Sequence, residues 1–251
     1  MSNSWTLQRD TAVRVLRPEG AVYETAAAQL LHYLNALCGI TEARSQSAPA
    51  IILRTDPSMP PDAFRLVVRG NDLHLVGQNG RGVLYAVFAL AERFGCRLFA
   101  HDTEVIPHPA ELSLPDGLDV TEASPFAYRD LYWIGTTDPL TAVKLRINGT
   151  GLKSGQHIRH LTAEVGGGPL FVHTFDLLLP PEKYFAEHPE YYALIDGKRT
   201  AKHLYSQPCL SNPDVLRIMI EGIRSWLRDN PEARLVSVSQ NDSFVIGSYC
   251  T

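Results

Sequence analysis

The chain has 251 residues, a net charge of −4 and a pI near 6.1; 45% of its residues are hydrophobic and 20% are charged. This globular composition is enough for one large domain or two small ones, and the absence of a basic block argues against a nucleic-acid partner. No run of about 18 apolar residues occurs, so no membrane span is expected. Residues 1–10 lack an apolar core, so the chain as written has no signal peptide and is expected in the cytoplasm.

The first hundred residues predict an α+β domain. Strands are expected at 11–16, 50–54, 64–69, 73–77 and 96–99, and helices at 22–38 and 80–94. Gly39 can end the first helix, Asn79 can cap the second, and Gly70-Asn71-Asp72 supplies a hairpin turn. The order β-α-β-β-β-α-β predicts helices layered on a mostly antiparallel sheet.

A Pro-rich segment, residues 101–125, is interpreted as a linker or as a segment that follows the edge of the domain, with the domain boundary near Glu122. The expected domains are therefore residues 1–121 and residues 122–251. In the second domain, strands are expected at 126–133, 170–175 and 234–240, helices at 181–187 and 213–228, and a hairpin at 192–197; residues 143–147 fit either a helix or a strand. These elements predict the start of a βα series with parallel strands.

Polar residues follow the predicted strand at 234–240. They are Gln240, Asn241 and Asp242, and His173 lies near the end of the strand before. Because α/β folds bind ligands at the carboxyl ends of their strands, these side chains are candidates to hydrogen-bond a hydroxyl-rich ligand. The alternatives are an ordinary polar loop and a histidine satisfied within the core.

Two aromatic residues, Tyr132 and Trp133, end the first predicted strand of the second domain. They suit the face of a sugar, with core packing as the alternative. Hydrolysis of a glycoside needs two carboxyl groups about 5–9.5 Å apart. Asp242 is the one carboxylate clearly placed at a strand end, and Asp130 and Asp176 are weaker candidates.

No sequence motif indicates a metal or a cofactor. HExxH, GxSxG and paired-cysteine patterns do not occur, so neither is expected. Cys38, Cys96 and Cys209 are expected to be core or loop thiols. The Asn-x-Ser/Thr triplets at 148–150 and 241–243 are expected to be chance matches to the glycosylation pattern, because no secretion signal precedes them.

Longer motifs resemble known families. Residues 73–99 are similar to the non-catalytic amino-terminal domain that precedes the barrel in family 20 hexosaminidases and family 67 α-glucuronidases. Residues 173–175, 179–199, 209–213 and 236–242 resemble the domain of unknown function 4838. That group includes glycoside hydrolase family 163, whose members are endo-β-N-acetylglucosaminidases acting on complex N-glycans. The resemblance covers roughly residues 10–250.

The resemblance implies a (β/α)8 barrel, an oligosaccharide or glycan substrate, and acidic catalytic residues on later strands. A barrel needs about 250 residues, and the roughly 130 from Glu122 onward suffice for about three strands, so the barrel is expected to be incomplete. The catalytic carboxylates are then expected beyond Thr251, which leaves catalysis by this chain open. The exposed edge of such a sheet predicts self-association.

The function expected for the complete protein, with its whole barrel, is therefore that of an endo-β-N-acetylglucosaminidase. The alternatives are an α-glucuronidase-like hydrolase and, from a different class, a non-catalytic carbohydrate-binding or interaction module.

Overall fold

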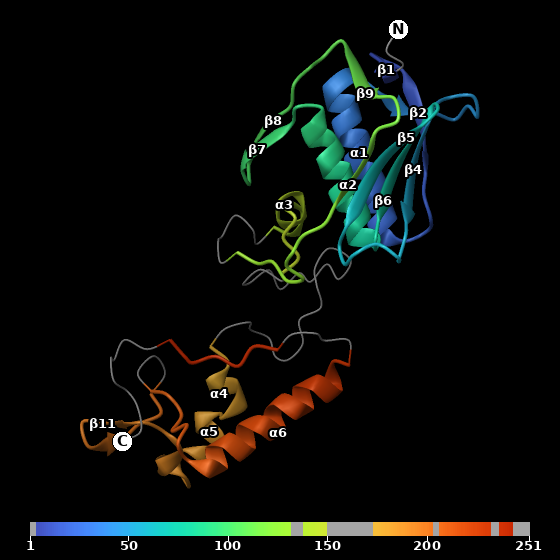
Figure 1. Ribbon diagram of the computed structural model, residues 1–251. Helices are drawn as coiled ribbons and strands as arrows, with labels where there is room; N and C mark the ends of the chain where they lie inside the picture. The colour runs from blue at the N-terminus through green and yellow to red at the C-terminus, as the bar shows by residue number, and fades with distance from the viewer. Residues whose placement is uncertain (1–3, 132–137, 150–172, 203–205, 232–235, 243–251) are drawn as a thin grey trace. The chain divides into compact units, whose positions relative to one another are not determined.

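The computed structural model describes residues 4–131, 138–149, 173–202, 206–231 and 236–242. The chain forms two compact units, residues 1–163 and residues 164–251, and each is described by itself (Figure 1). The first unit reaches past Glu122 because residues 126–131 and 138–149 make contacts within it. Compactness does not decide where a family domain starts, so the domains 1–121 and 122–251 stay predictions.

A six-stranded sheet forms the base of the first unit, with the strand order β10-β5-β6-β4-β2-β3. Its strands are β2 (Ala12–Leu16), β3 (Thr41–Glu42), β4 (Ala50–Thr55), β5 (Phe64–Arg69), β6 (Asp72–Gly77) and β10 (Asp119–Glu122). The pairs β2–β3, β2–β4 and β4–β6 are parallel, and only β5–β6 and β10–β5 are antiparallel.

The prediction of a mostly antiparallel sheet is therefore wrong. Parallel pairing needs a crossover connection, which the first helix supplies between β2 and β4. The hairpin of β5 and β6 was visible in the sequence because its turn is local, whereas the pairing of β4 with β6 joins strands that are not consecutive.

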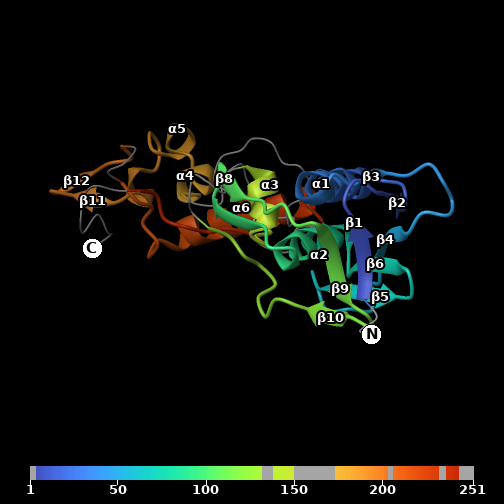
Figure 2. The same ribbon diagram turned by 90° about the horizontal axis from the view of Figure 1, so that it is seen from above.

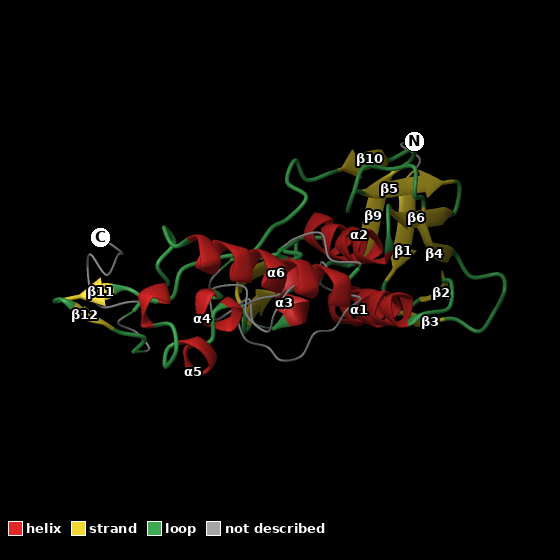
Figure 3. Cartoon of the chain, turned by 90° about the horizontal axis from the view of Figure 1, so that it is seen from below, coloured by secondary structure: helices red, strands yellow, loops and turns green. Residues whose placement is uncertain are grey.

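Two helices lie side by side on one face of this sheet (Figures 2 and 3). They are α1 (Ala21–Cys38) and α2 (Gly80–Arg93), close to the predicted ranges. Gly39 ends α1 in the left-handed region at φ 67°, and the Asn79 side chain accepts a hydrogen bond from the backbone N–H of Gly82 at 2.9 Å. Every residue of α2 from Gly82 to Ala91 is buried, so this helix is the centre of the core.

The segment 101–125 belongs to the first unit, and its strand β10 (Asp119–Glu122) forms an edge of the sheet, which agrees with the second of the two interpretations and not with a linker. It contains the strands β8 (Thr103–Val105), β9 (Glu111–Pro115) and β10. Two further strands of the unit lie outside this segment, β1 (Ser4–Gln8) and β7 (Arg97–Ala100). β9 pairs with β1, β8 with β7, and β10 with β5. Short strands next to prolines leave a weak sequence pattern, so their pairing was not foreseen.

The predicted strand at 126–133 is not found. Residues 126–131 form no strand, and Tyr132 and Trp133 lie outside the described residues. Part of the ambiguous segment 143–147 is helical, because α3 spans Pro139–Lys144 with Asp138 as its cap.

Short helices and one long helix make up the described part of the second unit. The elements are α4 (Phe175–Leu178), α5 (Pro181–Tyr184), the 3-10 turn η2 (Pro189–Tyr191), β11 (Leu194–Ile195), β12 (Lys198–Arg199) and α6 (Pro213–Asp229). The predicted hairpin and the helix α6 are confirmed, with the Asn212 side chain accepting from the N–H of Asp214 at 2.9 Å. Phe175, Leu178, Tyr192, Val215 and Met219 belong to its apolar core.

Two predicted strands of the second unit differ from the structure. Phe175 begins α4 instead of ending a strand, and residues 170–172 lie outside the described part. Residues 236–240 run without a strand partner, and 234–235 are not described. The chain is thus a mixed α/β structure, and the barrel itself stays a prediction.

Cys38 and Cys96 are buried free thiols, as predicted, whereas Cys209 belongs to a disulfide. The described helices include none that is long and apolar enough to cross a membrane.

Candidate functional site

A threonine joins the two segments that carry the predicted site residues. Thr174 is fully buried; its N–H donates to the carbonyl of Ser239 at 3.1 Å, and its hydroxyl donates to the carbonyl of Ser237 at 3.1 Å. The same hydroxyl accepts from the N–H of Ser239 at 2.9 Å. Because one hydroxyl can both donate and accept, Thr174 replaces the backbone ladder that two paired strands would have made.

Asn241 is held from two sides. Its side chain accepts from the N–H of Asp176 at 3.1 Å and donates to the Asp176 carboxylate at 2.6 Å. Its backbone N–H donates to Gln207 Oε1 at 3.0 Å, and its carbonyl accepts from Gln207 Nε2 at 2.7 Å. Asn241 is 4% exposed and Gln207 is 7% exposed, so these bonds are shielded from water and fix the position of the chain at residue 241.

His173 and Asp242 lie on the exposed side of this cluster. His173 has a φ of 56°, which is uncommon for a residue other than glycine. Its Nδ1 is 3.1 Å from the carbonyl oxygen of Gln240, and its Nε2 is 3.9 Å from Asp242 Oδ2. The His173 side chain is 41% exposed and the Asp242 side chain is 76% exposed, and Gln240 is also exposed. A ligand can therefore reach these polar groups from solvent.

Four of the six predicted binding residues are thus brought together, namely His173, Gln240, Asn241 and Asp242. Tyr132 and Trp133 lie outside the described residues. Among the four, Asn241 is buried and turned towards Asp176, while the other three are accessible.

Asp176 and Gln207 complete the cluster. Asp176 was a weak candidate because it stood after a predicted strand, and its contact with Asn241 gives it a place in the site. Gln207 was not anticipated, because no local pattern shows that its side chain meets a backbone 34 residues further along. Asp130 lies in the first unit, where its carboxylate accepts from the hydroxyl of Tyr128 at 2.7 Å.

The first unit holds a separate buried ionic network around Asp62, which is 6% exposed. Its carboxylate accepts from Arg81 at 2.8 Å, Arg129 at 3.0 Å, Asn79 at 2.9 Å and Asn148 at 2.7 Å. Burial by itself raises the pKa of Asp62, but the Arg81 ion pair and the amide donors outweigh it and lower the pKa to about 2. The network attaches Arg129 and Asn148 to Asp62 and to Arg81 of α2.

Both Asn-x-Ser/Thr triplets of the sequence begin with an asparagine whose side chain is hydrogen-bonded. Asn148 is 1% exposed, and its Nδ2 donates to both Asp62 and the carbonyl of Ala127. The Nδ2 of Asn241 likewise donates to Asp176. Neither amide nitrogen is accessible in the fold, which agrees with the interpretation of both triplets as chance matches.

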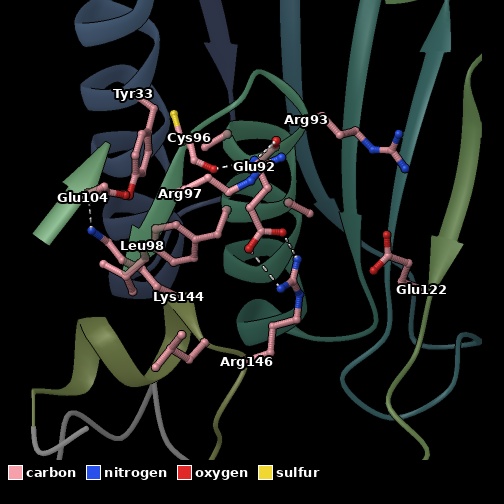
Figure 4. Close-up of a pocket in the computed structure, with 14 residues that line it drawn as sticks. Tyr33, Glu92, Arg93, Cys96, Arg97, Leu98, Glu104, Glu122, Lys144 and Arg146 are labelled. Atoms are coloured by element: carbon pink, nitrogen blue, oxygen red, sulfur yellow. Dashed lines mark hydrogen bonds and ion pairs between the residues drawn. The ribbon is translucent and has the colours of Figure 1, made fainter. Parts of the chain in front are cut away.

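A cavity of about 370 Å³ opens in the first unit between α1, the end of α2, the β7–β8 hairpin and α3 (Figure 4). Its charged walls pair with one another: Glu104 accepts from Tyr33 and, at 3.0 Å, from Lys144, and Arg146 donates to Glu92 at 2.6 Å. Burial raises the pKa of the Cys96 thiol in this wall to about 11, so the thiol stays protonated near neutral pH. We assign the cavity no chemistry.

No group of three or more histidine, cysteine or acidic residues in the described ranges is arranged to hold a metal ion.

The fold is similar to that of glycoside hydrolases. A family GH115 4-O-methyl-α-glucuronidase with specificity for decorated arabinogalactans aligns with a TM-score of 0.60 and 13% identity, over 90% of this chain and 41% of that one. Weaker alignments reach a GH20 exo-β-N-acetylglucosaminidase from Vibrio harveyi (TM-score 0.36, 18% identity, 51% of this chain and 18% of that one). They also reach a GH20 β-N-acetylhexosaminidase from Streptomyces coelicolor A3(2) (TM-score 0.37, 17% identity, 51% and 25%). The chain spans less than half the length of each of these enzymes.

The family is identified by sequence. Residues 98–251, more than half of the chain, match the model of the domain of unknown function DUF4838, and the chain belongs to this family. No curated protein matches it significantly.

Proposed function

We propose that this protein is carbohydrate-active and that the cluster around Asn241 binds the sugar. The reaction that we propose for the whole protein is glycoside hydrolysis of the endo-β-N-acetylglucosaminidase type. The observation that carries the proposal is the placement of His173, Gln240 and Asp242, all exposed, on a base held by buried hydrogen bonds. Carboxylate, imidazole and amide groups match the hydroxyls of a sugar, and sites that recognise small ligands rely on a few such groups held in place.

The residues of the cluster take different roles. His173, Gln240 and Asp242 contact the sugar, and Asn241, together with Gln207, holds them in position. Tyr132 and Trp133 stay proposed as sugar-binding aromatic residues. Within the described cluster, the carboxylate of Asp242 is exposed and that of Asp176 is bonded to Asn241. We therefore do not propose these two residues as the pair of carboxylates that hydrolysis needs. The catalytic acid and base are proposed to lie outside this cluster.

An α-glucuronidase-like hydrolase is the second candidate. The fold similarity to the GH115 enzyme, which extends over 90% of this chain, supports it. A non-catalytic carbohydrate-binding module is the alternative from a different class.

One experiment separates the three. The purified chain is incubated with a complex N-glycan and, separately, with a glucuronic-acid-decorated arabinogalactan, and both binding and released products are measured. Binding of the N-glycan together with release of product is the expected result, and preference for the arabinogalactan would favour the glucuronidase. Binding without any product favours the module. If neither glycan binds, the proposal of a carbohydrate-active protein is wrong.

A further inference from the structure

The hydrogen bond between His173 and Gln240 determines which ring nitrogen of the histidine carries the proton. Nδ1 is 3.1 Å from the carbonyl oxygen of Gln240. A carbonyl oxygen only accepts, so Nδ1 must be the donor. In the neutral imidazole the other nitrogen, Nε2, then has a lone pair and accepts hydrogen bonds.

Nε2 faces a second acceptor. The nearest carboxylate oxygen of Asp242 is 3.9 Å away, beyond the length of a direct hydrogen bond. With a neutral ring, neither group can donate to the other. The arrangement is satisfied by a ligand or solvent that brings hydrogen-bond donors to both acceptors at once.

The spacing of this acceptor pair is set by the buried side of the site. Gln240 and Asp242 are the two neighbours of Asn241. The backbone of Asn241 is bonded to the buried side chain of Gln207, and its own side chain is bonded to the half-buried Asp176. The carbonyl that orients His173 and the carboxylate of Asp242 are thereby presented by one short, restrained segment. A site held in its binding geometry loses less entropy when its ligand binds.

We propose that His173 Nε2 and the Asp242 carboxylate form a two-acceptor site for two adjacent hydroxyl groups of one sugar ring, a vicinal diol. This inference rests on the proposed function, since it assumes that the ligand is a saccharide. The site binds hydroxyl groups that donate hydrogen bonds. A sugar whose adjacent hydroxyls are methylated keeps its oxygen atoms but has no hydrogen to donate, so it should bind weakly. Asn241 acts as a positioning residue and does not contact the sugar.

The test compares two probes with the full chain by NMR titration at about pH 8. The first probe is methyl N-acetyl-β-glucosaminide, whose ring has one vicinal diol, and the second is its 3,4-di-O-methyl derivative. We expect methylation to weaken binding at least about tenfold, because hydrogen bonds to a charged group are among the stronger ones.

Two variants test the protein side. Asp242→Asn replaces one acceptor oxygen by a donor without changing the size of the side chain. His173→Asn removes the ring but keeps a residue that tolerates positive φ. Each should weaken binding of the first probe at least about tenfold. Asp229→Asn, an exposed substitution at the end of α6, is the matched control and should leave binding unchanged.

The possible failures are distinguishable. If the first probe does not bind to the wild-type chain, this inference is wrong, and the proposed function is wrong as well only if the N-glycan and the arabinogalactan also fail to bind. Equal binding of both probes, or unchanged binding by the two variants, refutes only the acceptor pair. The ¹⁵N shifts of the His173 ring give a check that needs no ligand: a proton on Nε2 at about pH 8 overturns the inference.

Discussion

Replacement of Asp62 by alanine tests whether the buried network holds the first unit together. The carboxylate is 6% exposed and accepts from two arginines, Arg81 and Arg129, whose side chains are 15% and 16% exposed. Asp62→Ala leaves both cations without this partner. Removing one side of a buried ion pair costs about 3–5 kcal/mol, because the remaining charge stays desolvated.

The pKa of Asp62 provides a second measure of the same interaction. A decrease from 3.8 to about 2 corresponds to about 2 kcal/mol of preference for the charged carboxylate in the fold. The substitution should cost more than this, because protonation leaves the carboxyl oxygens in place as acceptors whereas alanine removes them.

Amide hydrogen exchange measures this loss in the unit concerned. Backbone amides of β6, in the middle of the core, exchange through unfolding of the first unit, so their protection reports its free energy of unfolding. The matched control is Asp119→Ala, which removes the surface partner of Arg65 and should change protection little. If Asp62→Ala reduces protection no more than the control does, the network is not what stabilises the unit.

Two further predictions follow from the structure, and a third comes from the sequence. The pKa of Asp62 is lowered in the fold, so its contribution to stability is complete above the unfolded value near 3.9, decreases as the pH falls, and is lost below about 2. Urea unfolding of the wild type between about pH 4 and pH 2 should show this loss. The free energy of unfolding of Asp62→Asn should depend less on pH over the same range. Gly39→Ala should destabilise the protein more than Gly70→Ala. Both glycines have positive φ, so an alanine at either position is strained by about 1–2 kcal/mol. In addition, a Cβ at Gly39 would lie 2.1 Å from the Asp10 carboxylate, whereas Gly70 faces open space. Equal melting temperatures of these two variants would refute the steric argument. Self-association, expected from an exposed sheet edge, stays a prediction, and sedimentation that shows only monomer at micromolar concentration would contradict it.

The elements that the sequence predicted correctly depend on local interactions. The helices α1, α2 and α6 each have an apolar repeat, and their ends are set by neighbouring residues, namely Gly39, Asn79 and Asn212. A cap or a hairpin turn is made by residues a few positions apart, so the sequence contains all the information that the prediction needs.

The proximity of four candidate residues was predicted for a related reason. Polar side chains next to apolar segments indicated that His173 and the residues 240–242 belong to one ligand-facing edge, and the structure does bring them together. The described parts of the predicted strands, residues 173–175 and 236–240, form no strand. Thr174 binds the segment 237–239 through both its backbone N–H and its hydroxyl, and that arrangement has no periodic pattern.

Interactions between distant residues were decided only by the tertiary structure. The parallel pairing of β4 with β6, the assignment of residues 101–125 to the first unit, and the ionic network between Asp62 and Arg129 all join segments far apart in the chain. The same holds for the bonds between Gln207 and Asn241. The sequence by itself determined the helices, their caps and the candidate polar residues, because these depend on neighbours along the chain. Which buried groups meet, and therefore which side chains remain free for a ligand, depended on packing.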